Sequence, residues 1–133
     1  MARKLTLAPL LAALLLAACG EAPQRQPIPG PEARKAVDDA TAAYADCVEQ
    51  GAREAPAGGI PGTVIEGIVA SCKAERQALA ERILELHRLG HPSMTEDQSR
   101  TVAEASIQQI EPDIKSAGVA AYVEQTSQTQ KAS

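Results

Sequence analysis

The sequence predicts an all-α fold, a small three-helix bundle, on three observations. The chain has 133 residues with no Phe or Trp and only two Tyr, and alanine is abundant. Apolar residues recur at spacings of three and four in three stretches, which is the pattern of amphipathic helices. Segments rich in Pro and Gly separate these stretches, and runs of β-branched residues are few. We therefore expect helix throughout the folded domain, which we place at residues 32–126.

The first helix is predicted from about Glu32 to Gly51. Pro31 is well placed at its first turn, and the acidic Glu32 suits the positive end of the helix dipole. Its apolar stripe consists of Ala33, Ala36, Val37, Ala40, Ala43, Tyr44, Cys47 and Val48. Residues 53–62, R-E-A-P-A-G-G-I-P-G, predict a loop by their proline and glycine content.

The second helix is predicted from about Thr63 to Leu89. Gly90 can end it, and Pro92 prevents its continuation. At about 1.5 Å per residue it would be about 40 Å long, which is longer than so small a core requires. Its apolar stripe consists of Ile65, Ile68, Val69, Cys72, Leu79, Ile83 and Leu86.

The third helix is predicted to start near Ser93, because Ser93 and Glu96 have the spacing of a capping box. Pro112 falls opposite its apolar stripe, which favours one helix kinked at Pro112 over two separate helices. Beyond Thr126 the chain is polar, and we expect a frayed end with a disordered tail at residues 127–133. The stripe consists of Ala103, Ile107, Ile110, Ile114, Ala117 and Ala121.

The N-terminal segment combines Arg3 and Lys4 with an apolar run, Leu5 to Leu16, that is too short to span a membrane. The run ends in L-A-A-C at residues 16–19, which resembles the lipobox of bacterial lipoproteins. The resemblance implies that residues 1–18 are a signal peptide and that Cys19 becomes the acylated first residue, anchored permanently by its acyl chains. The alternative is an ordinary cleaved signal with a cysteine nearby by chance.

Gly20 follows Cys19, and the lack of Asp at this position resembles lipoproteins that are sent on to the outer membrane. The expected location is therefore the outer membrane, with the protein facing the periplasm. Residues 19–31 would contain the lipidated cysteine and a linker whose four prolines favour extended chain. At about 3.1 Å per residue, this linker could hold the domain roughly 35 Å from the membrane.

Charge and composition exclude several partner classes. Arg3 and Lys4 are two of the 13 basic residues, so the chain beyond residue 18 keeps 11 basic against 17 acidic residues. This acidic balance argues against nucleic acid and anionic lipid headgroups, which require a basic face. With only two aromatic rings, the chain is also poorly supplied for stacking bases or sugars.

The two remaining cysteines, Cys47 and Cys72, lie on the apolar stripes of the first and second helices. In the oxidising compartment that the lipobox implies, we expect them to form a disulfide between these helices. The alternatives are a labile redox pair or a thiol metal site, and neither has the C-x-x-C spacing that would support it. We therefore predict no metal and no cofactor.

The expected disulfide also predicts an antiparallel register for the first two helices. In an antiparallel pair, the residue numbers of two contacting positions have a constant sum. Taking that sum from Cys47 and Cys72 places Ala40 beside Leu79. The same register places Arg76 near Tyr44, and we predict that the guanidinium lies over the Tyr44 ring. The alternative is that Arg76 extends into water.

The candidate catalytic groups all have simpler interpretations. His87 and His91 are four residues apart, but Gly90 ends the predicted helix between them and no third ligand is nearby. Glu81 and Glu85 lie on a charged outer face. Ser71 and Ser93 have no histidine base at a recognisable spacing. The sequence therefore does not predict an enzyme.

The motifs Y-A-D-C-V at residues 44–48 and V-A-S-C-K at residues 69–73 resemble those of small two-cysteine helical proteins of the bacterial envelope. The resemblance implies an architecture and no activity. By elimination, we expect a membrane-tethered, non-catalytic module that binds another envelope protein. The alternatives are a periplasmic chaperone or stress protein and a small-ligand or metal carrier. A further possibility is a homodimer formed through Leu84 and Leu89.

Overall fold

The computed structural model describes residues 30–132, and every regular element within this range is an α-helix. The helices are α1 (Pro31–Glu54), α2 (Pro61–Ser71), α3 (Lys73–Gly90) and α4 (Glu96–Lys131). The all-α prediction is confirmed, but the predicted number of helices is wrong, since residues 30–132 form four helices and not three. Cys19, like the rest of the predicted signal peptide and linker up to Pro29, lies outside the described residues.

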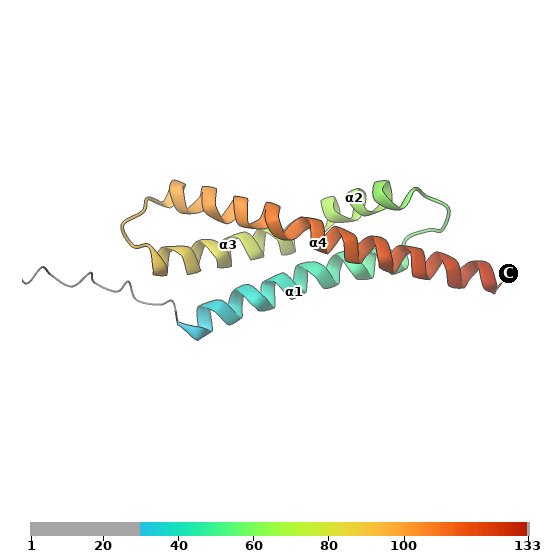
Figure 1. Ribbon diagram of the computed structural model, residues 1–133, viewed down its shortest axis with the longest axis horizontal. Coiled ribbons are helices and arrows are strands. Elements are labelled where there is room, and N and C mark those ends of the chain that lie inside the picture. Colours follow the sequence, from blue (N-terminus) through green and yellow to red (C-terminus); the bar gives the residue numbers. More distant parts are fainter. Residues whose placement is uncertain (1–29, 133) are drawn as a thin grey trace, which may run out of the picture.

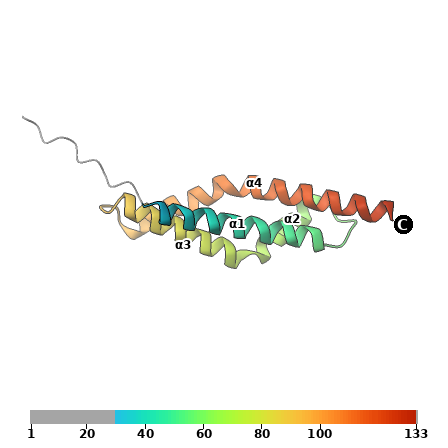
Figure 2. The same ribbon diagram turned by 90° about the horizontal axis from the view of Figure 1, so that it is seen from below.

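The four helices form an elongated bundle (Figure 1). α1 and α4 run along most of its length, and α2 and α3 follow one another along the third position of the bundle. α3 packs against α1 and α4 at one end, and α2 packs against the same two helices at the other end (Figure 2). The first helix and the middle segment run in opposite directions, as the register predicted, but the middle segment is divided.

The division of the predicted second helix occurs at Cys72. This residue has φ −83° and ψ 27°, outside the helical range, and α3 begins at the next residue. The Ser71 hydroxyl donates a hydrogen bond to the Ile68 carbonyl at 2.7 Å, and the Cys72 N–H donates to the same carbonyl at 3.0 Å. A serine hydroxyl that shares a helix carbonyl in this way can bend the helix locally. The turn lets α2 and α3 take separate paths across α1 and α4.

Prolines fix three of the remaining helix boundaries. Ala55, Ile60 and His91 each precede a proline, and each has backbone angles outside the helical range, with ψ values of 143°, 119° and 64°. The proline ring disfavours helical angles in the residue before it. The loop at residues 55–60 therefore falls within the predicted loop at residues 53–62.

The start of α4 differs from the prediction. Thr95 and Gln98 form the capping box, with the Thr95 hydroxyl accepting from the Gln98 N–H at 3.3 Å and the Gln98 side chain accepting from the Thr95 N–H at 2.9 Å. Ser93 fails as the cap because it lies in a tight turn, closed by the Met94 N–H donating to the His91 carbonyl at 3.1 Å. The spacing of the motif is the same, but it is shifted by two residues.

α4 is one continuous helix through Pro112, whose ring is exposed to solvent. The prediction of a single helix with the proline pointing outward is therefore confirmed. The helix also continues beyond Thr126 to Lys131, where we expected a frayed end. Side-chain hydroxyls of Thr126 and Ser127 donate to the carbonyl of Val123 in this last part, at 3.0 and 2.8 Å.

The core lies along the line where the helices meet, and much of it consists of small or medium aliphatic side chains. At its centre Gly118 of α4 lets the helix backbone approach α1 and α2. A Cβ added at Gly118 would lie 2.8 Å from Val48 Cγ1 and 3.2 Å from Ile65 Cδ1. The buried apolar residues are Tyr44, Val48, Ala52, Ile65, Cys72, Leu79, Ile83, Ala103, Ile107, Ile114, Ala121 and Tyr122.

Candidate functional site

The disulfide between Cys47 and Cys72 joins α1 to the junction of α2 and α3, with the two Cα atoms 6.1 Å apart. The predicted pairing is confirmed. Because the disulfide lies where the middle segment turns, it fixes both α2 and α3 to α1. The disulfide therefore lies at the residue whose backbone angles separate α2 from α3.

Four polar side chains connect α1, α3 and α4, and the two on α1 and α3 lie about one helical turn from the disulfide cysteines. We call this group the clamp: Tyr44 of α1, Arg76 of α3, and Glu104 and Glu111 of α4. Glu111 Oε1 accepts two hydrogen bonds, one from the Tyr44 hydroxyl at 3.0 Å and one from Arg76 Nε at 2.9 Å. The terminal nitrogens of Arg76 donate to both carboxylate oxygens of Glu104.

The contacts within the clamp shift the pKa values of Tyr44, Arg76 and Glu111. Burial raises the pKa of Tyr44 to about 12, and its hydrogen bond to Glu111 acts in the same direction. Hydrogen bonds to Glu104 and Glu111 raise the pKa of Arg76 further above its ordinary value. Burial alone would raise the pKa of Glu111, but hydrogen bonds from Arg76 and Tyr44 outweigh burial and lower it. Each shift stabilises the protonation state that the group already has at pH 7.

The clamp corrects the predicted role of Arg76. Tyr44 and Arg76 do meet, but through Glu111, to which both donate. The guanidinium pairs with two carboxylates, and only 29% of the Arg76 side chain is exposed, so it does not simply extend into water. The sequence analysis missed Glu104 and Glu111. The two glutamates are seven residues apart, and each directly follows a stripe residue, Ala103 or Ile110. Both therefore lie on one edge of the helix, and this position is the signal that could have identified them.

The second tyrosine connects α4 to the loop at residues 55–60. The Tyr122 hydroxyl donates to the Pro56 carbonyl at 3.0 Å and accepts from the Gly59 N–H at 2.9 Å. Tyr122 is itself almost fully buried. The sequence analysis assigned it no role, although it follows Ala121 at the end of the predicted stripe. Both tyrosines of the chain therefore use their hydroxyl groups to join separate segments.

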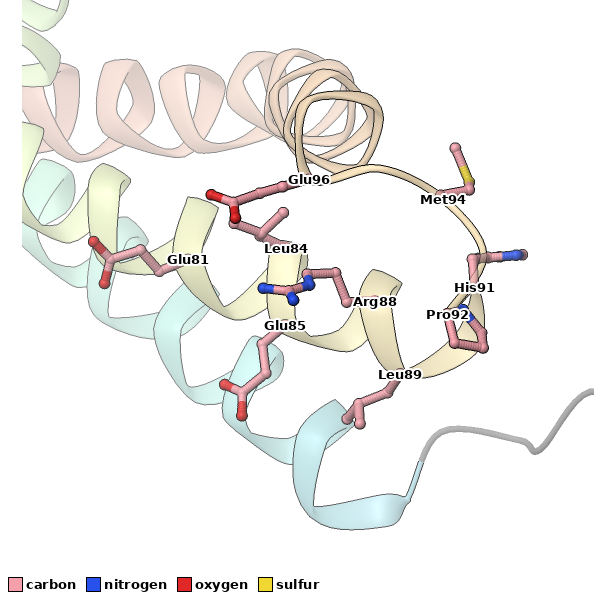
Figure 3. A pocket seen from close by; sticks show the side chains of 9 residues that line it. All are labelled: Glu81, Leu84, Glu85, Arg88, Leu89, His91, Pro92, Met94 and Glu96. Carbon is pink, nitrogen blue, oxygen red and sulfur yellow. The ribbon is translucent and has the colours of Figure 1, made fainter.

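A surface groove of about 560 Å³ lies between the end of α3 and the start of α4 (Figure 3). Leu84 and Leu89, the residues of the predicted homodimer contact, line it, and 51% of Leu89 is exposed. Arg88 extends across the groove between Glu85 and Glu96, whereas His91 points outward from the turn. The remaining lining residues are Glu81, Pro92 and Met94. Both apolar and charged side chains therefore line the groove.

Among the other candidate residues, His87 and His91 lie together, whereas the described contacts bring none of the glutamates and serines to a partner outside its own segment. The His87 and His91 rings lie with centroids 4.6 Å apart, against each other at the end of α3. Glu81 and Glu85 are exposed and accept from Gln77 and Arg82 of their own helix. The Ser71 hydroxyl donates to its own helix, and Ser93 lies in the α3–α4 turn. None of these side chains therefore meets a nucleophile or base from another element in the described contacts.

Within residues 30–132, one group of side chains has the spacing to hold a metal ion. The Cys47 and Cys72 sulfurs and a carboxylate oxygen of Glu75 lie within 4.8 Å of one another.

No helix within residues 30–132 is both long and apolar enough to cross a membrane. Comparison of the chain with protein-family models, with curated proteins and with solved structures finds no match.

Proposed function

We propose that the protein is a lipid-anchored lipoprotein of the outer membrane, facing the periplasm, that acts as a non-catalytic protein-interaction module. The L-A-A-C motif at residues 16–19 supports the anchor. The Cys47–Cys72 disulfide supports export, because disulfides persist in oxidising compartments. Both features favour an exported protein, and the motif alone carries the proposal of a lipid anchor.

The observation that most supports a non-catalytic role is the direction of the pKa shifts in the clamp. A catalytic acid or base works best with a pKa near the operating pH. The pKa values of these groups are shifted away from neutrality, that of Tyr44 by burial and its hydrogen bond to Glu111, and those of Arg76 and Glu111 by hydrogen bonds that outweigh burial. The clamp thus has the properties of a structural connection.

The proposed contact surface is the end of the molecule formed by the α1–α2 loop. Ile60 of this loop is 76% exposed and Val123 of α4 is 45% exposed. The hydrogen bond between Tyr122 and Gly59 brings these two apolar side chains to the same end. Residues 55–65 contain no charged side chain, so this end offers an apolar contact on an otherwise acidic protein.

The groove does not favour the alternative of a small-ligand carrier. Its volume of about 560 Å³ is within the range of ligand sites. Ligand sites are mostly enclosed and apolar, however, whereas Glu81, Glu85, Arg88 and Glu96 place four charged side chains along this open groove.

Two experiments test the proposal in intact cells. Metabolic labelling with an alkyne fatty acid should label the native protein and fail to label the Cys19→Ser variant, which should also leave the membrane fraction. A photo-crosslinking amino acid at Ile60 should capture one recurrent envelope protein, and the same group at the exposed Gln108 of α4 should not. Capture of many unfolded proteins would instead favour the chaperone, and equal capture from both positions would contradict the proposed surface.

A further inference from the structure

We propose that Cys47, Cys72 and Glu75 form a zinc site when the disulfide is reduced. The three ligand atoms already lie within 4.8 Å of one another. Two thiolates and a carboxylate are ligands that Zn²⁺ accepts in its tetrahedral coordination, with water in the fourth position. The inference does not depend on the proposed interaction function.

The backbone spacing of the cysteines suits a metal as well as a disulfide. With zinc–sulfur distances of about 2.3 Å, two thiolates on one tetrahedral ion are about 3.8 Å apart. The Cα atoms of Cys47 and Cys72 are 6.1 Å apart, so rotation of the two side chains can open the sulfurs to this separation without moving the helices. Glu75 follows Cys72 by three residues and lies on the same side of the chain.

A hollow at the surface reaches the site, although Cys72 itself is buried, and the charged side chains that line it are negative. A surface hollow of about 470 Å³ lies over the disulfide, between α1 and the α2–α3 junction. Its charged lining residues are all acidic: Asp46, Glu54 and Glu75. A hollow lined by charge of one sign concentrates ions of the opposite sign. A divalent cation would therefore reach the sulfurs from this side.

The clamp keeps the ligands together when the disulfide is open. Tyr44 precedes Cys47 by three residues on α1, and Arg76 follows Cys72 by four residues at the start of α3. The Tyr44–Glu111 and Arg76–Glu111 hydrogen bonds hold these two segments to the same residue of α4. Neither contact involves a sulfur atom, so reduction does not itself remove a donor or an acceptor from them. The ligands are therefore pre-positioned by interactions that do not involve sulfur.

The chemistry requires a reductant, which we take to be an external dithiol. The dithiol gives two electrons and two protons to the Cys47–Cys72 bond and becomes a disulfide itself. Zn²⁺ then displaces one proton from each thiol and binds the two thiolates and the Glu75 carboxylate. Zinc binding and disulfide formation use the same sulfur atoms and exclude each other. Metal occupancy would thus report the redox state of the protein.

The test uses Co²⁺ in place of Zn²⁺, because thiolate-to-cobalt charge transfer gives a distinct absorption band. The protein is reduced with a phosphine, which is removed under nitrogen, and is then titrated with Co²⁺ and back-titrated with Zn²⁺. We expect one equivalent of Co²⁺ with the thiolate band in the reduced protein and no band in the oxidised protein. If reduction alone unfolds the helices, binding should restore their far-ultraviolet circular dichroism together with the band.

The variants separate the ligands from the fold. Glu75→Gln leaves both cysteines in place, so the oxidised protein should still form the disulfide. In the reduced protein it should weaken Zn²⁺ affinity about tenfold or more, because even the loss of a residue that hydrogen-bonds a metal ligand costs about that much. Glu81→Gln, on the same helix but outside the hollow, should leave the affinity unchanged. The Cys47→Ser/Cys72→Ser double variant should give no band. No band in the reduced native protein, or unchanged affinity in Glu75→Gln, would overturn the site.

Discussion

Replacing Gly118 by alanine tests whether the close crossing of α4 over α1 and α2 determines the stability of the bundle. Helix propensity alone predicts that any Gly→Ala change within a helix stabilises by about 1 kcal/mol. At Gly118 the new Cβ would lie 2.8 Å from Cγ1 of Val48, a buried β-branched side chain with little rotational freedom. Relieving such overpacking costs about 1–3 kcal/mol, which cancels or exceeds the gain.

Gly67 of α2 is the matched control, because it is exposed and an added Cβ would meet no atom within 4 Å. Gly67→Ala should therefore stabilise by about 1 kcal/mol, while Gly118→Ala should lie about 1–3 kcal/mol below it. Urea unfolding of the oxidised proteins, followed by far-ultraviolet circular dichroism, measures both changes as shifts of the midpoint at constant slope. Equal stabilisation by the two variants would show that α4 has room at Gly118 and would refute the reasoning.

Three further predictions concern the clamp and the disulfide. Because the folded-state pKa of Tyr44 is raised from 10.0 to about 12, its contribution to stability is complete below pH 10 and should fall by about 2–3 kcal/mol as the pH rises through 12. Tyr44→Phe should remove this alkaline loss in urea unfolding, and in the native protein one tyrosinate should appear in the absorbance titration only near pH 12. The pKa of Glu111 is lowered below 4.5, so its contribution to the free energy of unfolding is present above that pH and is lost on acidification. Glu111→Gln should therefore flatten the fall of stability at acidic pH. An unchanged fall would show that other carboxylates dominate it. Reducing the Cys47–Cys72 disulfide, which closes a separation of 25 residues, should lower the free energy of unfolding by about 3–4 kcal/mol, as measured by urea unfolding with and without reductant.

The helical content and most element boundaries could be predicted from the sequence, because they depend on local chemistry. The apolar spacing defines the faces of the helices, and the prolines at 56, 61 and 92 fix three boundaries through the residue before each ring. The cysteines lay on facing stripes, which was enough to pair them once an oxidising compartment was inferred. Pro112 was correctly placed on the outer face because the stripe keeps its phase through it.

The break at Cys72 and the clamp were decided by the tertiary structure. A hydroxyl bond from Ser71 and one residue with altered angles divide the middle helix, and neither changes the hydrophobic pattern that predicted a continuous helix. Arg76 interrupts the apolar stripe between Cys72 and Leu79, but only the packing of α4 shows that its partners are Glu104 and Glu111.

The sequence by itself determined the helical class of the fold and most of the buried faces, since these follow from spacing along one chain, and it paired the cysteines once the lipobox implied an oxidising compartment. The tertiary structure alone decided which polar groups meet across helices. That choice depends on the relative rotation and offset of α1, α3 and α4, to which residues such as Gly118 contribute by setting how closely the backbones approach. Interactions between helices, including the clamp and the sulfur–carboxylate group at Glu75, therefore required the fold.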